Sequence, residues 1–206
     1  FKQRRSQSIK PEYEYNNDLV RFFLDDNGYK IRNSTSPYIN LRVNSNKSNT
    51  KKIVYIHPFT GGSSKTLSVN DFINLCYELN KFCKLKFVLH CDHSDYEKCK
   101  IIENKMCNLL DVETINPTND LKEMFKNISK CDVFISGSTG PLHVAGALNI
   151  KTVGFYPAKK SSTSLRWDTI NNQNNKLFFE DADIFSQDIQ VDIQSVAAEI
   201  FDKLLK

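Results

Sequence analysis

The sequence predicts an α/β fold, a Rossmann-like doubly wound parallel sheet. From about residue 52, short apolar runs alternate with segments of helical length and amphipathic pattern. This alternation is typical of βαβ units, which build a parallel sheet covered by helices on both faces. The chain has 206 residues, of which 40% are hydrophobic and 25% charged. It is therefore long enough for one such domain and has an ordinary globular composition.

The apolar runs give the order of the elements. Strands are expected at 52–56, 85–90, 112–116, 132–136, 152–156 and 176–179, and helices near 68–83, 95–109, 119–130 and 140–148. The last segment predicts a closing helix with Asp192 as its cap. One helical stripe of this segment carries apolar residues: Ile193, Val196, Ile200 and Leu204.

The first fifty residues differ from the rest of the chain. They begin with a basic, polar stretch, and residues 16–29 suit a short helix that stops at Gly28. The following residues are rich in Asn, Ser and Lys, as in connecting chain. The sequence therefore predicts two parts. Residues 1–50 are an interdomain segment with a short helix and a linker, and residues 51–206 are the Rossmann-like domain.

Composition argues against several classes of protein. The six cysteines form no C-x-x-C pair and are interpreted as reduced, structural thiols of a cytoplasmic protein. The segment "HCDH" at 90–93 is interpreted as a strand end rather than a metal site. The net charge of +4 gives no argument for nucleic acid, and no apolar run has the length of a membrane span.

The loop after the first strand, residues 57–68, is a candidate phosphate site. Gly61 and Gly62 allow close backbone approach, Thr60 offers a hydroxyl, and Lys65 supplies a cation. The loop is not a Walker A motif, because Ser64 rather than glycine precedes the lysine. The alternative is an ordinary Gly/Ser turn followed by a solvated lysine.

The second candidate loop, "ISGSTGPLHVAGAL" at 135–148, prepares the start of a helix. Ser138 or Thr139 is expected to cap the helix, Gly140 admits close approach, and Pro141 suits the first turn. His143 falls in the same turn and is expected to contact a phosphate or sugar oxygen; the alternative is a structural histidine. Both loops follow strands of one parallel sheet, so they are expected to form an anion clamp at its carboxyl edge. Lys65 and His143 would then point into one cleft.

Two stretches together resemble glycosyltransferase family 9, the lipopolysaccharide heptosyltransferases. They are "IVYIHPFTGGSSKTLSVNDFINLCYEL" at 53–79 and "ISGSTGPLHVAGALNIKTVGFYP" at 135–157. The resemblance implies the GT-B architecture, two Rossmann-like domains facing each other, of which this chain is the C-terminal, donor-binding half. It implies an inverting transferase that moves heptose from ADP-heptose to a lipopolysaccharide or lipooligosaccharide core acceptor. The general base and the acceptor contacts would lie on an N-terminal domain, so this chain alone is expected to be inactive. The resemblance also implies a cytoplasmic enzyme with peripheral contact at the inner membrane.

The same resemblance implies a set of donor-binding residues. These are Thr60, Gly61, Lys65, Ser138, Thr139, Gly140 and His143. Looser matches are Glu97 and Asn119, and a basic loop is expected to meet phosphates or simply to be solvated: Lys159, Lys160 and Arg166. Ser138 stands where the family usually has an acidic residue associated with the donor sugar. No cofactor and no metal are expected, since no Asp-x-Asp pair is placed to hold a metal.

Two alternatives remain open at this point. One is a nucleotide-sugar epimerase or another GT-B enzyme, because donor-site architecture recurs among them. The other is a non-catalytic nucleotide-binding module.

Overall fold

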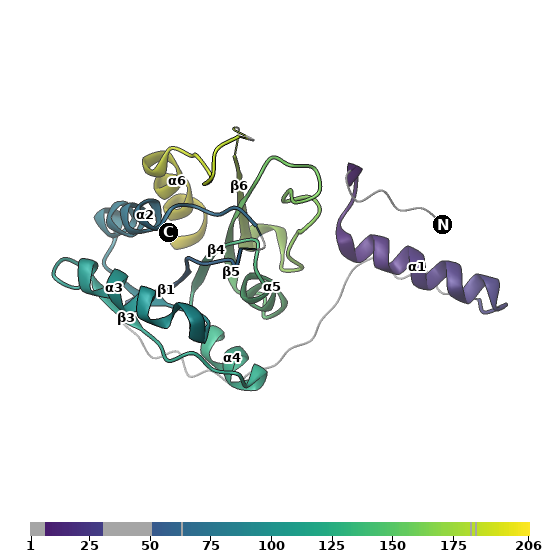
Figure 1. The fold of residues 1–206 in the computed structure, drawn as a ribbon, viewed down its shortest axis with the longest axis horizontal. Coiled ribbons are helices and arrows are strands. Elements are labelled where there is room, and N and C mark those ends of the chain that lie inside the picture. Colours follow the sequence, from purple (N-terminus) through teal and green to yellow (C-terminus); the bar gives the residue numbers. More distant parts are fainter. Residues whose placement is uncertain (1–6, 31–50, 63, 182, 184) are drawn as a thin grey trace.

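Six parallel strands form the sheet at the centre of the structure (Figure 1). They are β1 (Lys52–His57), β2 (Leu85–Leu89), β3 (Asp111–Thr114), β4 (Val133–Gly137), β5 (Lys151–Tyr156) and β6 (Lys176–Glu180). Their order is β3-β2-β1-β4-β5-β6, and every neighbouring pair is parallel. This is the strand order of doubly wound dinucleotide-binding domains, so the predicted fold class is confirmed. The computed structural model describes residues 7–30, 51–62, 64–181, 183 and 185–206.

The four central strands, β1, β2, β4 and β5, are mostly buried because helices cover the sheet on both sides. In β1, Val54 and Ile56 belong to one core cluster, whereas Tyr55 between them belongs to the other. This alternation follows from the two-residue period of a strand. All five residues of β4 are buried, which places this strand in the middle of the domain.

The covering helices are α2 (Val69–Phe82), α3 (Tyr96–Met106), α4 (Leu121–Ile128), α5 (Gly140–Ala147) and α6 (Ile193–Ile200), which continues as a π-helical turn over Phe201–Leu205. Helices α2, α3 and α6 contribute to the larger core cluster, and α2 packs against α6. Helices α4 and α5 cover the smaller cluster. The five predicted helices of the domain are therefore present, with ends that shift by a few residues.

Side-chain caps pair backbone N–H groups at the starts of α2 and α6. Ser68 accepts a hydrogen bond from the Asp71 backbone N–H at 3.1 Å and caps α2. Asp192 accepts from the backbone N–H groups of Gln194 and Ser195 and caps α6, as predicted. Such caps pair N–H groups that have no partner within the helix.

Helix α1 (Glu12–Asp26) precedes the sheet domain and begins four residues earlier than predicted. Pro11 stands at its N-cap, and two acidic residues in the first turn, Glu12 and Glu14, interact favourably with the positive end of the helix dipole. Gly28, with φ of 76°, lies just beyond the end of the helix, in the left-handed region that favours glycine. The expected connecting chain at 31–50 lies outside the described residues.

The cysteines are free thiols, and four of them are buried: Cys76, Cys91, Cys99 and Cys131. Across the described ranges, no group of three His, Cys, Asp or Glu side chains has the arrangement of a metal site. None of the helices described is both long and apolar enough to span a membrane.

Candidate functional site

The candidate site lies where β1 and β4 end side by side. These strands are neighbours in register, with His57 opposite Ser136. The chain leaves β1 toward α2 on one face of the sheet and leaves β4 toward α5 on the other. The two loops therefore diverge and open a crevice beyond the strand ends, where doubly wound folds bind their ligands.

Gly137, the last residue of β4, lets the two loops meet. A Cβ atom at this position would lie 2.8 Å from Thr66 Oγ1 and 3.1 Å from Thr60 Cγ2. A larger residue would push the loop after β1 away from the end of β4. The structure therefore brings the two predicted loops together. Thr66 Oγ1 is buried there and has no hydrogen-bond partner among the described atoms.

The loop after β1 turns at two glycines. Gly61 and Gly62 have φ of 58° and 77°, a backbone conformation that side chains disfavour. Both glycines are exposed and present bare backbone to solvent. Thr60 stabilises the turn, since its hydroxyl donates to the Ser64 carbonyl at 2.8 Å. The predicted tight turn is present, and its backbone is open to a ligand.

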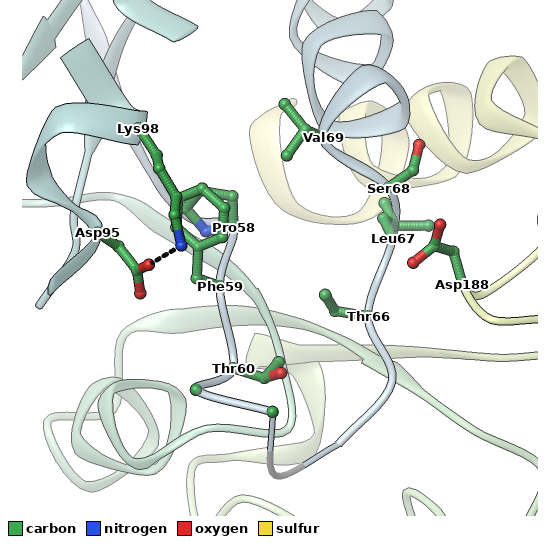
Figure 2. A pocket seen from close by; sticks show the side chains of 12 residues that line it. Pro58, Phe59, Thr60, Thr66, Leu67, Ser68, Val69, Asp95, Lys98 and Asp188 are labelled. Atoms are coloured by element: carbon green, nitrogen blue, oxygen red, sulfur yellow. Dashed lines mark hydrogen bonds and ion pairs between the residues drawn. The ribbon is translucent and has the colours of Figure 1, made fainter. Parts of the chain in front are cut away.

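A cavity of about 460 Å³ lies beside this turn (Figure 2). Its walls come from the loop after β1, the start of α2, the start of α3 and the segment before α6. The lining residues with chemistry are Phe59, Thr60, Thr66, Asp95, Lys98 and Asp188. In Figure 2 the Lys98 ammonium lies beside Phe59, 5.3 Å from the ring centre, and pairs with Asp95 at 2.8 Å. The cavity thus combines an aromatic wall with charged groups.

The start of α5 offers backbone N–H groups. Thr139 occupies the N-cap position as predicted, but its side chain makes no capping hydrogen bond. Its hydroxyl instead lies 3.0 Å from the Ser136 hydroxyl. Gly140, the first helical residue, is exposed, and a Cβ atom there would meet nothing within 4 Å. A helix start that has no side-chain cap and has space above it is suited to an anion.

Lys65 does not line the cavity; it contacts the segment that follows β6. Its ammonium lies 3.5 Å from a carboxylate oxygen of Asp181, 3.2 Å from Ser186 Oγ and 3.3 Å from the Asp183 carbonyl. The Asp181 carboxylate is fully buried and also accepts hydrogen bonds from Asp183 N, Ser186 Oγ and Gln190 N. Burial alone would raise the pKa of Asp181, but these hydrogen bonds and the Lys65 charge bring the pKa below its usual value. Residues 181–183 form an Asp-x-Asp triplet, and its first carboxylate is already held by these contacts.

His143 lines a second cavity, of about 270 Å³, between α5, the segment 166–170 and α1. Its ring makes an edge contact with Trp167, with 6.2 Å between ring centres. Burial lowers the pKa of His143, partly offset by Asp168, which favours the neutral imidazole. The structure therefore does not bring Lys65 and His143 into one cavity. The reason is that His143 lies nearly a turn beyond Gly140 on α5, on the side that faces α1.

The remaining predicted residues are dispersed. Ser138 is partly exposed between β4 and α5, and four others are exposed and line neither cavity: Glu97, Asn119, Lys159 and Lys160. Arg166 is not a solvated cation, because its side chain is only 6% exposed and pairs with Glu12 of α1 at 2.8 Å. Its guanidinium also lies over the Trp167 ring, 4.8 Å from the centre.

Sequence reasoning missed several residues around the site. Asp95, at the N-cap of α3 in the connection that follows β2, is buried and lines the larger cavity, whereas the neighbouring candidate Glu97 is exposed. The position of Asp95 after a strand was a usable signal. His57 and His90 form a buried pair beneath the loops, with 3.1 Å between their Nδ1 atoms. Burial lowers the pKa of both rings, that of His90 to about 3.

Residues 8–184 match the family model described as "Glycosyltransferase family 9 (heptosyltransferase)". A putative glycosyltransferase of Haemophilus influenzae is 35% identical over 189 residues, covering 86% of this chain and 54% of the relative. Lipooligosaccharide heptosyltransferase 2 of Campylobacter jejuni is 27% identical over 135 residues, covering 63% of this chain and 40% of the relative. The chain thus spans about half the length, or less, of these curated relatives.

Solved structures support the same fold. Escherichia coli heptosyltransferase WaaC with ADP matches with a TM-score of 0.66 and 15% identity, covering 91% of this chain and 56% of that one. E. coli ADP-heptose lipopolysaccharide heptosyltransferase II matches with a TM-score of 0.63 and 19% identity, covering 77% of this chain and 48% of that one. Both are enzymes of the GT-B architecture that the resemblance implies. With the family match over most of its length, the chain belongs to glycosyltransferase family 9.

Proposed function

We propose that this chain is the donor-binding part of an inverting glycosyltransferase. It holds a nucleoside diphosphate sugar, with ADP-heptose preferred, for transfer to a lipopolysaccharide or lipooligosaccharide core acceptor. The observation that carries the proposal is the meeting of the glycine turn after β1 with the uncapped start of α5 at Gly137. The similar solved structures, an ADP-heptose lipopolysaccharide heptosyltransferase and WaaC with ADP, support the choice of donor.

The diphosphate would lie between the two loops. Backbone N–H groups at the start of α5 would receive it, with the positive end of the helix dipole behind them. Lys65, whose ammonium lies 3.5 Å from the Asp181 carboxylate, would add a positive charge. The larger cavity would take the nucleoside, with Phe59 as an apolar wall and Asp95 as an acceptor for hydroxyl groups.

The proposed reaction uses this arrangement. An acceptor hydroxyl oxygen attacks the anomeric carbon, a general base takes its proton, and the bond from that carbon to the diphosphate oxygen breaks with inversion. The negative charge that develops on the leaving diphosphate is stabilised by the α5 N–H groups and by Lys65. The base and the acceptor contacts are assigned to the part of the enzyme that relatives have beyond this chain. No metal is assigned a role.

Calorimetric titration with ADP-, UDP-, GDP- and CMP-sugars, each with and without EDTA, tests the proposal. We expect ADP to bind with the same affinity with and without EDTA, and we expect the same of ADP-heptose. We expect no sugar transfer by this chain alone. Loss of binding in EDTA would refute the metal-free clamp. Transfer by the 206-residue chain, with no partner added, would show that the base lies within it.

A further inference from the structure

The connection between β6 and α6 places a buried carboxylate, that of Asp181, against Lys65. The side chain of Asp181 has 0% exposure, and a buried charge is unfavourable unless it is paired. Its Oδ2 atom lies 3.5 Å from the Lys65 ammonium. Its Oδ1 atom accepts hydrogen bonds from the backbone N–H groups of Asp183 and Gln190, at 2.8 Å and 3.4 Å. The two carboxylate oxygens therefore have different partners.

The negative charge of Asp181 is needed at Oδ2 rather than at Oδ1. An amide oxygen can also accept the two backbone hydrogen bonds, so Oδ1 explains a polar side chain but not a charged one. At Oδ2 the partners are the Lys65 ammonium and Ser186 Oγ, which lies 3.0 Å away. The Ser186 hydroxyl has a single proton and lies closer, at 2.7 Å, to the Asp188 carbonyl. Lys65 is therefore the partner that requires the charge.

The backbone on both sides of Lys65 is fixed, so its remaining freedom is in the side chain. The Ser64 carbonyl accepts a hydrogen bond from the Thr60 hydroxyl at 2.8 Å, and the Thr66 carbonyl accepts one from the Ile189 N–H at 2.9 Å. The lysine side chain is long and flexible, and ordering it costs conformational entropy. The contacts of its ammonium with the segment after β6 order this side chain in the absence of ligand.

We propose that Asp181, assisted by Ser186, is a positioning residue that holds the Lys65 ammonium in place for the diphosphate. The proposal rests on the proposed function, in which Lys65 contacts the diphosphate. Because its side chain is fully buried, Asp181 would act through Lys65 and not on the ligand itself. The connection between β6 and α6 would thereby contribute to donor affinity, although it belongs to neither loop of the site.

The variant Asp181→Asn separates the charge from the backbone contacts. The amide oxygen can keep both bonds to backbone N–H groups, and the amide NH₂ then faces the Lys65 ammonium, donor against donor. Calorimetric titration should show an ADP affinity about 3- to 10-fold lower, because one long side chain must then be ordered on binding.

Asp183→Asn is the matched control on the same segment. The Asp183 carboxylate is exposed and accepts a hydrogen bond from the Phe185 N–H at 2.8 Å. Asp183 meets Lys65 through its backbone carbonyl, which the substitution leaves in place. The control removes the same charge from the segment, and we expect it to leave ADP affinity unchanged.

The Lys65→Ala background distinguishes positioning from a purely structural role. If Asp181 acts through Lys65, Asp181→Asn should not weaken ADP binding further once the lysine is absent. An equal loss in both backgrounds would mean that Asp181 only supports the fold of the segment, and the inference would be overturned. An ADP affinity that Asp181→Asn leaves unchanged or increases would also overturn it, since the carboxylate would then be neutral or would compete with the phosphate.

Ser186→Ala provides the same test if Asp181→Asn does not fold. Ser186 is partly exposed, and its Oγ atom lies 3.2 Å from the Lys65 ammonium. We expect ADP binding about 2- to 4-fold weaker, as for loss of a neutral hydrogen bond, and no further change in the Lys65→Ala background. Unchanged ADP affinity, or an equal loss in both backgrounds, would count against positioning.

Reductive methylation of lysines, followed by mass spectrometry, tests the pairing without any nucleotide. Lys65 should react faster in Asp181→Asn than in the unmodified chain, whereas Lys81 on α2, with a side chain 64% exposed, should react equally in both. Equal reactivity of Lys65 in the two proteins would overturn the inference. If ADP binds and Asp181→Asn has no effect, the diphosphate site stands and only the positioning role is lost. If ADP binds to none of these proteins, both proposals fall.

Discussion

The Lys65 ammonium contacts a buried carboxylate, so removing the Lys65 side chain should affect stability as well as ligand binding. A solvated surface lysine contributes little to stability, but the Lys65 ammonium contacts Asp181, whose side chain is fully buried. The ammonium lies 3.2–3.5 Å from its partners on Asp181, Ser186 and Asp183. Lys65 is therefore interpreted as a residue that binds the phosphate and also stabilises the segment after β6.

Replacing Lys65 by Ala should accordingly have two effects. ADP affinity should fall about 10- to 100-fold, equal to roughly 1.5–3 kcal/mol for a hydrogen bond to a charged group. Without ligand, stability should fall by on the order of 1 kcal/mol, or about 2–4 °C in Tm, because Asp181 loses one partner. Calorimetry and thermal unfolding measure both. Lys81→Ala on α2, where the lysine side chain is 64% exposed, is the control. Unchanged ADP affinity in Lys65→Ala would show that Lys65 does not belong to the site.

The His57 and His90 pair makes stability depend on pH. Burial and the neighbouring His57 lower the pKa of His90 to about 3 in the folded state, whereas an unfolded histidine titrates near 6.5. The unfolded state therefore binds more protons as pH falls below about 6.5, and stability is lost from there toward pH 3. Each excess proton gives a slope of about 1.4 kcal/mol per pH unit.

Urea unfolding at pH 7, 6 and 5 measures this slope. We expect the variant His90→Gln to have a flatter pH dependence than the unmodified chain, whatever its absolute stability. His93→Gln, at an exposed histidine three residues away, should keep the original slope. An unaltered slope in His90→Gln would contradict the assignment.

At the scale of elements, α1 differs from the helices of the sheet domain. None of its 15 residues is buried, and helices of this length are marginal in isolation. Its first turn is held to the domain by Arg166, which pairs with Glu12 and whose backbone carbonyl accepts from the Glu12 N–H at 2.8 Å. Helix α1 also forms one wall of the second cavity, through Glu12, Tyr13 and Asn16.

Arg166→Ala should therefore loosen α1. Hydrogen exchange of amides in residues 12–26 should become faster, while β1 and β4 keep their protection, because the core contains no α1 residue. Lys160→Ala, an exposed cation in the same loop, should leave exchange unchanged. If α1 exchanges at the same rate in both variants, the Glu12–Arg166 pair does not hold it.

At the scale of the whole molecule, features that depend on a local sequence pattern can be predicted, whereas pairs of residues far apart in the sequence cannot. Apolar runs locate all six strands, and Gly140 with Pro141 locates the start of α5, because these signals are contained in short segments. Arg166 was misread because its partner Glu12 is 154 residues away and leaves no local signal. The Lys65–Asp181 and His57–His90 pairs were missed for the same reason. The facing of the two loops was predictable because the parallel topology imposes it.

A diphosphate is proposed to bind between the glycine turn and the start of α5. The chain has seven glycines, so selective ¹⁵N-glycine labelling gives an amide spectrum of at most seven signals. Four glycines surround the claimed site, Gly61, Gly62, Gly137 and Gly140, and three lie elsewhere, Gly28, Gly146 and Gly154. On titration with ADP in EDTA, we predict that signals of the first group shift, Gly140 most of all, and that those of the second group stay in place. Binding of ADP that leaves Gly61, Gly62 and Gly140 unshifted, or that shifts only the second group, would contradict the account.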